Sequence, residues 1–452
     1  MDNKRINELE NITSVESGDL LPILDVSDDS FTGVTKNIRI DQLPGGTGGA
    51  VDSVNGKVGS VTLNASDVGL GDTATISHHK TSTGIIYDLI EIKNANAKSI
   101  TKRFAPGYDN TGAVDKIPAR EFSKQTGYRY VMNADGFLNA DGTPGWNNVN
   151  VRPCGLQIVD NTVVVEWDNV AHADFPQAVI MQSNGILAPA FLDDGKSGQE
   201  WVDEGALWSV GWGAFCVLNG EQVPISQPNH TMQEGVKTAR PVLCQKANGD
   251  IFIIQIEGKT DVYGATTSEV SALCYGLGAK TAFIMDGGGS SQNWWNGTYA
   301  VPSSDTSGNF PSERGVPTFL TIDCERVQEE YDSGTIVIET NSNVTPMSGA
   351  GPVLYLRHIG KNVFVSVRAA GTFPASVSTQ IVDAGKFPFR YMNTSDGLSR
   401  LNITGNSGRH MSLIISPGTQ NGTINNYTSG TNMTYATGSG SWQAQFTDID
   451  YI

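Results

Sequence analysis

A short apolar run that stops abruptly at an acid constrains this chain of 452 residues more than any other stretch. Residues 282–285 (Ala-Phe-Ile-Met) are followed by Asp286, and then by Gly287, Gly288, Gly289, Ser290 and Ser291. A buried strand has this pattern when its end opens into a site, because glycines let the backbone turn sharply and approach a ligand. The pattern therefore predicts a strand that presents Asp286 beside a turn whose free N–H groups bind a phosphate or a sugar hydroxyl. Taken alone, it is equally typical of a loop capped by its aspartate.

The neighbouring segments repeat this design. Residues 266–278 carry apolar side chains at helical spacing, with Thr266 or Thr267 as N-cap and Gly278 as C-cap. Residues 251–256 (Ile-Phe-Ile-Ile-Gln-Ile) predict a second buried strand, which ends at Glu257 as the first ends at Asp286. Two strands thus deliver an acid at their ends.

Two arginines accompany the two acids. Arg240 lies in the segment 237–244, and Arg314 immediately precedes another predicted strand in residues 313–322. From here the chain resembles a known family, the phosphodiester glycosidases typified by N-acetylglucosamine-1-phosphodiester α-N-acetylglucosaminidase. The resemblance covers roughly residues 128–323 and rests on an ordered series of motifs: residues 133–137 (Asn-Ala-Asp-Gly-Phe), Arg240, Glu257-Gly258-Lys259, Thr267 with Glu269, residues 286–291, Asn296-Gly297, and Glu313-Arg314.

This chain departs from the family pattern at three positions. It has Glu257 and Lys259 where the family more often shows Asp and Arg, and Pro241 where Thr is usual. The resemblance implies four catalytic residues, Asp286, Glu257, Arg240 and Arg314. The expected substrate-binding residues are Asn133, Asp135, Gly287, Gly288, Gly289, Ser290, Ser291 and Trp294.

The chemistry of a sugar-1-phosphodiester suits these side chains. Its hydrolysis expels a phosphate monoester, which needs charge stabilisation, so Arg240 and Arg314 are expected to hold the phosphate. Asp286 or Glu257 would stabilise the oxocarbenium-like centre, either as nucleophile or as base to a water. No cofactor is required by the pattern, although Asp135 and Asp286 are hard ligands of the kind that Ca²⁺ takes. Trp294 offers a flat ring for a sugar face, although about half of such tryptophans fill the core instead.

Composition limits the classes of partner. The net charge of −17 argues against nucleic acid and against an anionic membrane as binding partners, whereas a sugar polymer remains compatible with it. Five cysteines without a C-x-x-C pair indicate buried thiols. The sequence has no apolar run near the ~20 residues of a membrane span, and its first residues lack the apolar region of a secretory signal.

The N-terminal part resembles phage proteins. Residues 2–43, with short strands expected at 20–24 and 38–40, resemble the attachment segment of tail fibres and baseplate proteins. Residues 51–70 predict a hairpin turning at Asn55-Gly56, similar to the module repeated in fibre shafts, although an ordinary hairpin remains the alternative. Residues 77–104 predict a helix whose apolar seam, at positions 85, 86, 89, 90 and 92, suits a self-associating stalk and hence a homotrimer. The preceding His78 and His79 are expected at a solvated helix start rather than on a metal.

Together these patterns predict a multidomain protein. The expected domains are an attachment segment and Gly linker (1–50), a fibre hairpin module (51–76), a helical stalk (77–127), a central mixed α/β phosphodiester-glycosidase-like domain (128–326), and an all-β sandwich or jelly-roll head (327–452).

The function expected from these domains is a tail-associated glycosidase of the virion. It would act outside the host cell on a cell-surface polysaccharide or teichoic acid, and its N-terminus would bind other tail or baseplate proteins. The alternative is a receptor-binding protein that holds a phosphorylated glycan without cutting it.

Overall fold

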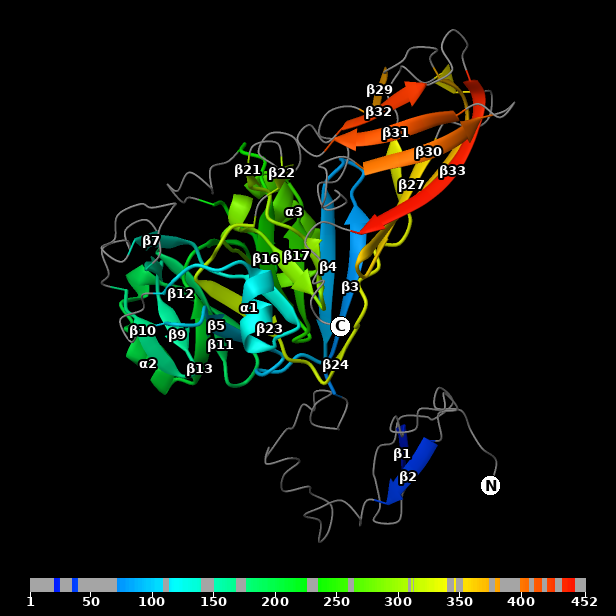
Figure 1. The fold of residues 1–452 in the computed structure, drawn as a ribbon. Helices are drawn as coiled ribbons and strands as arrows, with labels where there is room; N and C mark the ends of the chain where they lie inside the picture. The colour runs from blue at the N-terminus through cyan, green and yellow to red at the C-terminus, as the bar shows by residue number, and fades with distance from the viewer. Residues whose placement is uncertain are drawn as a thin grey trace. The chain divides into compact units, whose positions relative to one another are not determined.

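The computed structural model describes residues 20–24, 35–39, 71–108, 114–139, 150–167, 176–225, 235–258, 264–307, 310–311, 313–339, 345–346, 353–373, 379–382, 399–405, 410–416, 421–426 and 433–443. The chain divides into two compact units, Met1–Asp72 and Thr73–Ile452. In the first unit, β1 (Leu20–Leu24) pairs antiparallel with β2 (Thr35–Arg39), close to the two short strands expected there (Figure 1). The predicted hairpin module and Gly linker lie outside the described residues.

An eight-stranded sheet forms the centre of the second unit. Its order is β15 (Glu221–Gln222), β14 (Ala214–Leu218), β18 (Ala279–Ile284), β16 (Arg240–Lys246), β17 (Ile251–Ile256), β4 (Ile86–Lys93), β3 (Thr73–Lys80) and β24 (Arg326–Val327). One face is covered by α3 (Thr267–Gly276), whose Val270 and Cys274 pack on Val242 and Ile284. Thr266 caps this helix in a capping box with Glu269, so the predicted strands and helix are confirmed here.

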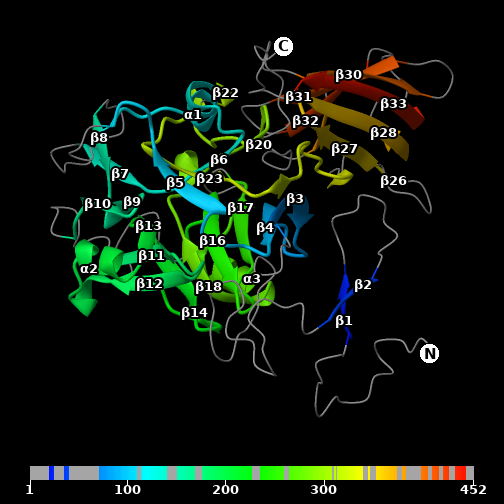
Figure 2. The same ribbon diagram turned by 90° about the horizontal axis from the view of Figure 1, so that it is seen from below.

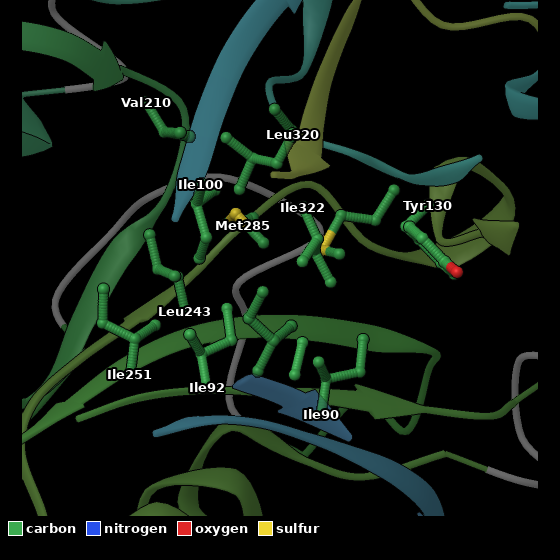
Figure 3. Packing of buried hydrophobic residues seen from close by; sticks show 14 of the residues in the cluster. Ile90, Ile92, Ile100, Tyr130, Val210, Leu243, Ile251, Met285, Leu320 and Ile322 are labelled. Carbon is green, nitrogen blue, oxygen red and sulfur yellow. The ribbon is translucent and has the colours of Figure 1, made fainter. Parts of the chain in front are cut away.

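A five-stranded sheet packs against the other face of the first sheet. Its order is β20 (Thr298–Val301), β19 (Asn293–Trp295), β6 (Tyr130–Asn133), β23 (Thr318–Ile322) and β5 (Ile100–Phe104). Figure 3 shows the shared core, in which side chains of the eight-stranded sheet such as Ile90 and Leu243 meet Ile100 and Leu320. The far face of the five-stranded sheet is covered by α1 (Ala119–Thr126), where the Phe122 ring stacks on Phe319 at 4.2 Å.

The predicted helical stalk is wrong, because most of residues 77–104 form β3, β4 and β5. Strand β4 is buried on both faces: Tyr87 and Leu89 face the core under α3, whereas Ile90 and Ile92 face the core between the sheets. A strand covered on both sides loses the period of two, so its sequence resembles an amphipathic seam. These isoleucines therefore pack inside one chain, and they provide no exposed apolar seam on which to base a trimer.

His78 and His79 do not start a helix either. Both lie in β3, where the Nδ1 atom of His78 is 2.8 Å from the Oδ1 atom of Asp88, a residue with no exposed surface. The pair is therefore part of a strand of the eight-stranded sheet, between β4 and β24.

Smaller hairpins and the short helix α2 (Gly198–Asp203) complete the domain; Figure 2 shows them grouped on one side of it. The strands form the pairs β7 (Phe137–Asn139) with β8 (Val151–Pro153) and β9 (Gln157–Val159) with β10 (Thr162–Val165), and the sheet of β12 (Leu187–Phe191), β11 (Gln177–Gln182) and β13 (Ala206–Val210). Asp160 and Asn161 take positive φ at the β9–β10 turn, and Asn219-Gly220 does so between β14 and β15. Asn, Asp and Gly adopt this conformation more readily than other residues, which is why they occupy such tight hairpin turns.

The C-terminal part is all-β, as predicted. Its strands are β25 (Ile336–Glu339), β26 (Thr345–Pro346), β27 (Val353–Ile359), β28 (Asn362–Phe373), β29 (Thr379–Val382), β30 (Ser399–Gly405), β31 (His410–Ser416), β32 (Asn421–Asn426) and β33 (Met433–Gln443). Hydrogen bonds join them into one antiparallel sheet of nine strands, and the two-sheet sandwich or jelly roll stays a prediction.

Four of the five cysteines are buried. Cys154, Cys216, Cys244 and Cys274 are buried free thiols, as predicted, and Cys324 is partly exposed. Within the described ranges, no helix is both long enough and apolar enough to cross a membrane.

Candidate active site

The ends of three neighbouring strands create the site. Strand β16 runs antiparallel to β17 on one side and to β18 on the other, so β17 and β18 end at the edge where β16 begins. In this register Ile256 pairs with Arg240 and Ile284 pairs with Val242. The structure therefore brings Glu257, Asp286 and Arg240 to one edge of the sheet.

Asp286 is a carboxylate held in an unfavourable environment. Only 6% of the residue is exposed, and this burial raises the pKa of its carboxyl from 3.8 to about 6. The nearby charge of Asp135 also raises the pKa, whereas hydrogen bonds from Ser290 and the Gly287 N–H, together with the charge of Arg314, oppose the rise. A carboxyl whose pKa lies close to neutral pH, in a site at the end of a strand, is typical of an acid–base or nucleophilic group.

Arg314 reaches the same point from the other side. Its Nε and Nη2 atoms donate to the two carboxylate oxygens of Asp305, at 2.5 and 2.8 Å, and its Nη1 atom donates to the Ser290 hydroxyl at 3.2 Å. The two-point pairing fixes the plane of the guanidinium, whose side chain keeps 21% of its surface exposed. Ser290 thus bridges Asp286 and Arg314.

Asn133 and Gln292 position these groups. The Asn133 amide donates to the backbone oxygen of Asp286 at 2.7 Å and accepts from the Gln292 N–H at 3.1 Å. The Gln292 side chain donates in turn to the backbone oxygen of Arg314 at 3.1 Å and accepts from the Ala119 N–H at 2.8 Å. Both residues have no exposed surface, so Asn133 orients the Asp286 backbone instead of contacting substrate.

The predicted anion nest in the glycine turn is not formed. The N–H groups of Gly288, Ser290 and Ser291 donate to carbonyl oxygens of the protein, at 2.8, 3.2 and 3.1 Å. The glycines serve close packing: a Cβ on Gly287 would collide with the carbonyl oxygen of Ala239, and one on Gly289 would collide with the Asp305 carboxylate and Arg314. Ser291 lies in the interior, where its hydroxyl accepts from Gln255 at 3.0 Å.

Arg240 lies at the site edge but turns away from it. Its side chain occupies the same face of β16 as Val242 and Cys244, under α3. The Nε and Nη2 atoms donate to the backbone oxygens of Ala265 and Val236, at 2.8 and 3.0 Å, and only 1% of the residue is exposed. Burial lowers the pKa of Arg240 to about 10. The expectation that Arg240 contacts phosphate is therefore corrected to a role in fixing the strand edge against the start of α3.

Asp135 also makes its contacts inside the protein. It has no exposed surface and forms an ion pair with Lys102, 2.7 Å from its Nζ atom. Its oxygens also accept from the Gly211 N–H at 2.7 Å and the Thr318 hydroxyl at 2.9 Å. Neither substrate binding nor Ca²⁺ binding is compatible with this pairing, and the described part of the chain contains no group of three or more acidic, His or Cys side chains suited to a metal.

Trp294 packs in the core instead of in the site. Only 1% of the residue is exposed, and its ring meets Tyr299 edge-on at 4.9 Å beside Phe122. It cannot stack on a sugar in this position. Glu257, 4% exposed, keeps its place at the strand edge through its N–H, which donates to the Ile86 carbonyl oxygen at 3.0 Å.

Two further residues of the candidate site, Asp305 and Gln292, are not predicted from the sequence. Asp305 lies in a loop of Ser, Thr and Asp residues whose composition singles out no position. Gln292 directly follows the glycine–serine motif, and a long polar side chain before the apolar pair Trp294-Trp295 was the available signal.

Comparisons with known proteins agree with the sequence resemblance. Residues 126–322 match the family model described as phosphodiester glycosidase, so this part of the chain is similar to that family. The chain is 28% identical over 268 residues to the SPbeta prophage-derived uncharacterized protein YomE of Bacillus subtilis (strain 168). That match covers 55% of this chain and 38% of the relative, so it spans well under half the length of the relative.

Solved structures give weaker similarities. The catalytic domain of zebrafish N-acetylglucosamine-1-phosphodiester α-N-acetylglucosaminidase aligns with a TM-score of 0.45 and 17% identity, covering 56% of this chain and 82% of that one. A hypothetical protein from Synechocystis aligns with a TM-score of 0.36 and 14% identity, over 56% of this chain and 62% of that one.

Proposed function

We propose that the phosphodiester glycosidase-like domain hydrolyses a sugar-1-phosphodiester, with Asp286 acting at the sugar and Arg314 at the phosphate. One observation carries this proposal: Asp286, Ser290, Arg314 and Asp305 form a continuous chain of hydrogen bonds at the edge of the sheet. It places a carboxyl of raised pKa next to a guanidinium of fixed orientation.

Each end of this chain suits one part of the reaction. The departing phosphate monoester carries the developing charge, and a donor already held in place stabilises it without reorganisation. Asp305 holds two of the three nitrogens of Arg314, so the Nη1 edge beside Ser290 is the part directed at the phosphate. Above pH 6 Asp286 is mainly ionised and can act as nucleophile at the anomeric carbon or as base to a water.

We further propose that the substrate is a wall or capsular polymer of a bacterial host, and that the protein belongs to a phage tail. The fibre-like sequence of residues 51–70 supports this, as does the relative described as prophage-derived. Under this proposal the protein acts extracellularly, as part of the virion, on a teichoic-acid-like chain. In the alternative, the same site binds a phosphorylated glycan during adsorption without cutting it.

Hydrolysis assays with methyl diesters of hexose 1-phosphates and purified host wall test the proposal. The wild type should release reducing sugar, and Asp286→Asn should lower kcat by at least about a hundredfold, the lower bound for loss of an acid–base group. Asp160→Asn is the matched control, because Asp160 is an exposed aspartate in the β9–β10 turn and should leave the rate unchanged. Tight binding to host wall without hydrolysis of any diester would favour the receptor-binding alternative.

A further inference from the structure

We propose that Lys116 is the second cation of the phosphate subsite and binds one non-bridging oxygen of the phosphodiester while Arg314 binds the other. This inference rests on the proposed function, since it assigns the part of that site that selects for phosphate. It gives Lys116 the role that the sequence had suggested for Arg240.

The backbone places Lys116 directly beside the Arg314 segment. Ile117 and Val316 form an isolated antiparallel bridge, with N–H to oxygen distances of 3.2 and 2.9 Å. Between them the chains touch: a Cβ built on Gly315 would lie 2.9 Å from the backbone carbon and the Cβ of Lys116. Only glycine permits this approach, which brings Lys116 next to the neighbour of Arg314.

An aromatic ring sets the direction of the Lys116 side chain. Its ammonium nitrogen lies over the Phe137 ring, 4.6 Å from the ring centre. Phe137 ends the segment that begins with Asn133, whose amide holds the Asp286 backbone. Lys116 thus lies between the Asn133–Phe137 segment and the loop that carries Arg314, and a cation–π contact of this kind restricts an otherwise flexible side chain.

The electrostatics of this position favour an anion. Burial lowers the pKa of Lys116, and the positive charge of Arg314 lowers it further. Two cations brought together raise the free energy of the empty site, and a bound phosphate would relieve that repulsion. Two nearby carboxylates already receive an arginine: Asp305 accepts two N–H groups of Arg314, and Glu313 accepts from Arg120 at 2.7 Å.

The two cations differ in a way that suits a diester. Arg314 offers a fixed planar edge, whereas Lys116 offers a compact charge with three rotatable donors. A phosphodiester keeps one negative charge shared by two non-bridging oxygens, so one oxygen can meet each cation. Uncharged aryl glycosides would leave both cations close together without an anion, and the site should discriminate against them.

Binding of inorganic phosphate, measured by titration calorimetry on the full chain, tests the inference without requiring turnover. Lys116→Gln should weaken phosphate binding by at least about tenfold, equal to about 1.4 kcal/mol, and Lys116→Arg should restore most of it. The control is Lys280→Gln, because Lys280 is exposed in β18 near the strand end opposite to Asp286. Added salt should weaken wild-type binding more than binding by Lys116→Gln.

Kinetics on the methyl diesters separate this inference from the proposed function. If the wild type cleaves diesters and Lys116→Gln matches it in both phosphate affinity and kcat/KM, the Lys116 assignment is overturned while the function stands. If no diester is cleaved but Lys116→Gln still loses phosphate affinity, the subsite is supported and the catalytic proposal is not. Equal losses in Lys116→Gln and Lys280→Gln would show a general charge effect and would also overturn the assignment.

Discussion

Replacing Asp286 by Asn should stabilise the folded protein while it removes activity. In the folded chain burial raises the pKa of Asp286 from 3.8 to about 6. One pKa unit corresponds to about 1.4 kcal/mol, so ionising this carboxyl in the fold costs up to about 3 kcal/mol relative to the unfolded chain. The amide of Asn keeps the shape and carries no charge, although it accepts less well from the Ser290 hydroxyl and the Gly287 N–H. A net gain of about 1 to 3 kcal/mol is therefore expected at high pH.

The sign of the effect depends on pH. Below pH 3.8 the carboxyl is protonated in both the folded and the unfolded chain, so it adds no penalty. Between 3.8 and about 6 the unfolded chain loses its proton first, and the free energy of unfolding of the wild type falls as pH rises. Above about pH 6 the full penalty applies. The advantage of Asp286→Asn should therefore be small near pH 4 and complete near pH 8.

Thermal melts of both proteins at about pH 4 and about pH 8 measure this difference. For a domain of 150–250 residues, 1 kcal/mol shifts Tm by about 2–4 °C, so the variant should melt several degrees higher at the upper pH only. Asp160→Asn, at an exposed turn, should show no such dependence. A variant that is no more stable at pH 8 than at pH 4, relative to wild type, would refute the claim that Asp286 is held ionised at a cost.

Three further outcomes follow from the same contacts. Since the pKa of Asp286 is about 6, kcat/KM should rise with pH through that value, and a rate that falls instead would make Asp286 an acid rather than a base. Lys102→Met leaves the buried Asp135 without its cation and should lower the free energy of unfolding by about 3–5 kcal/mol, measured by urea titration. Gly289→Ala should lower kcat/KM with the circular dichroism spectrum unchanged, because the added methyl collides with the Asp305 carboxylate; unchanged activity would mean that this loop adapts.

Local patterns predicted the elements that carry the site, and failed where both faces of a strand are covered. Residues 251–256 and 282–285 are apolar, β-branched and bounded by glycine or acid, and they form β17 and part of β18. The α3 capping box is equally local. The apolar spacing of residues 85–92 likewise indicates that they are buried, but it does not distinguish a strand from a helix. A strand covered on both faces and the apolar seam of a helix share this spacing. Only the sheet order, with β4 beside β17, decides between them.

The sequence predicted Asp286 and Arg314 for the proposed site, but neither Asp305 nor Lys116. Asp286 and Arg314 follow from the strand ends and from the family resemblance. Lys116 belongs to a segment with no motif, and its proximity to Arg314 arises from one bridge between residues 199 positions apart along the chain, Ile117 and Val316. Such a contact is tertiary, so no window of sequence contains it.

The hydrogen bonds that each charged side chain makes inside the protein distinguish residues that look alike in the sequence. Asp135 meets a lysine, a backbone N–H and a hydroxyl, and Arg240 donates to two carbonyl oxygens, so both are committed to the fold. Arg314, in contrast, keeps part of its side chain exposed, and Asp286 keeps its carboxyl near neutrality at the free end of β18. A group whose bonds are all made inside the protein gains nothing from a ligand, whereas one held at a free-energy cost gains when substrate arrives. By this criterion we propose that the substrate meets Asp286 and Arg314, while Asp135 and Arg240 hold the frame around them.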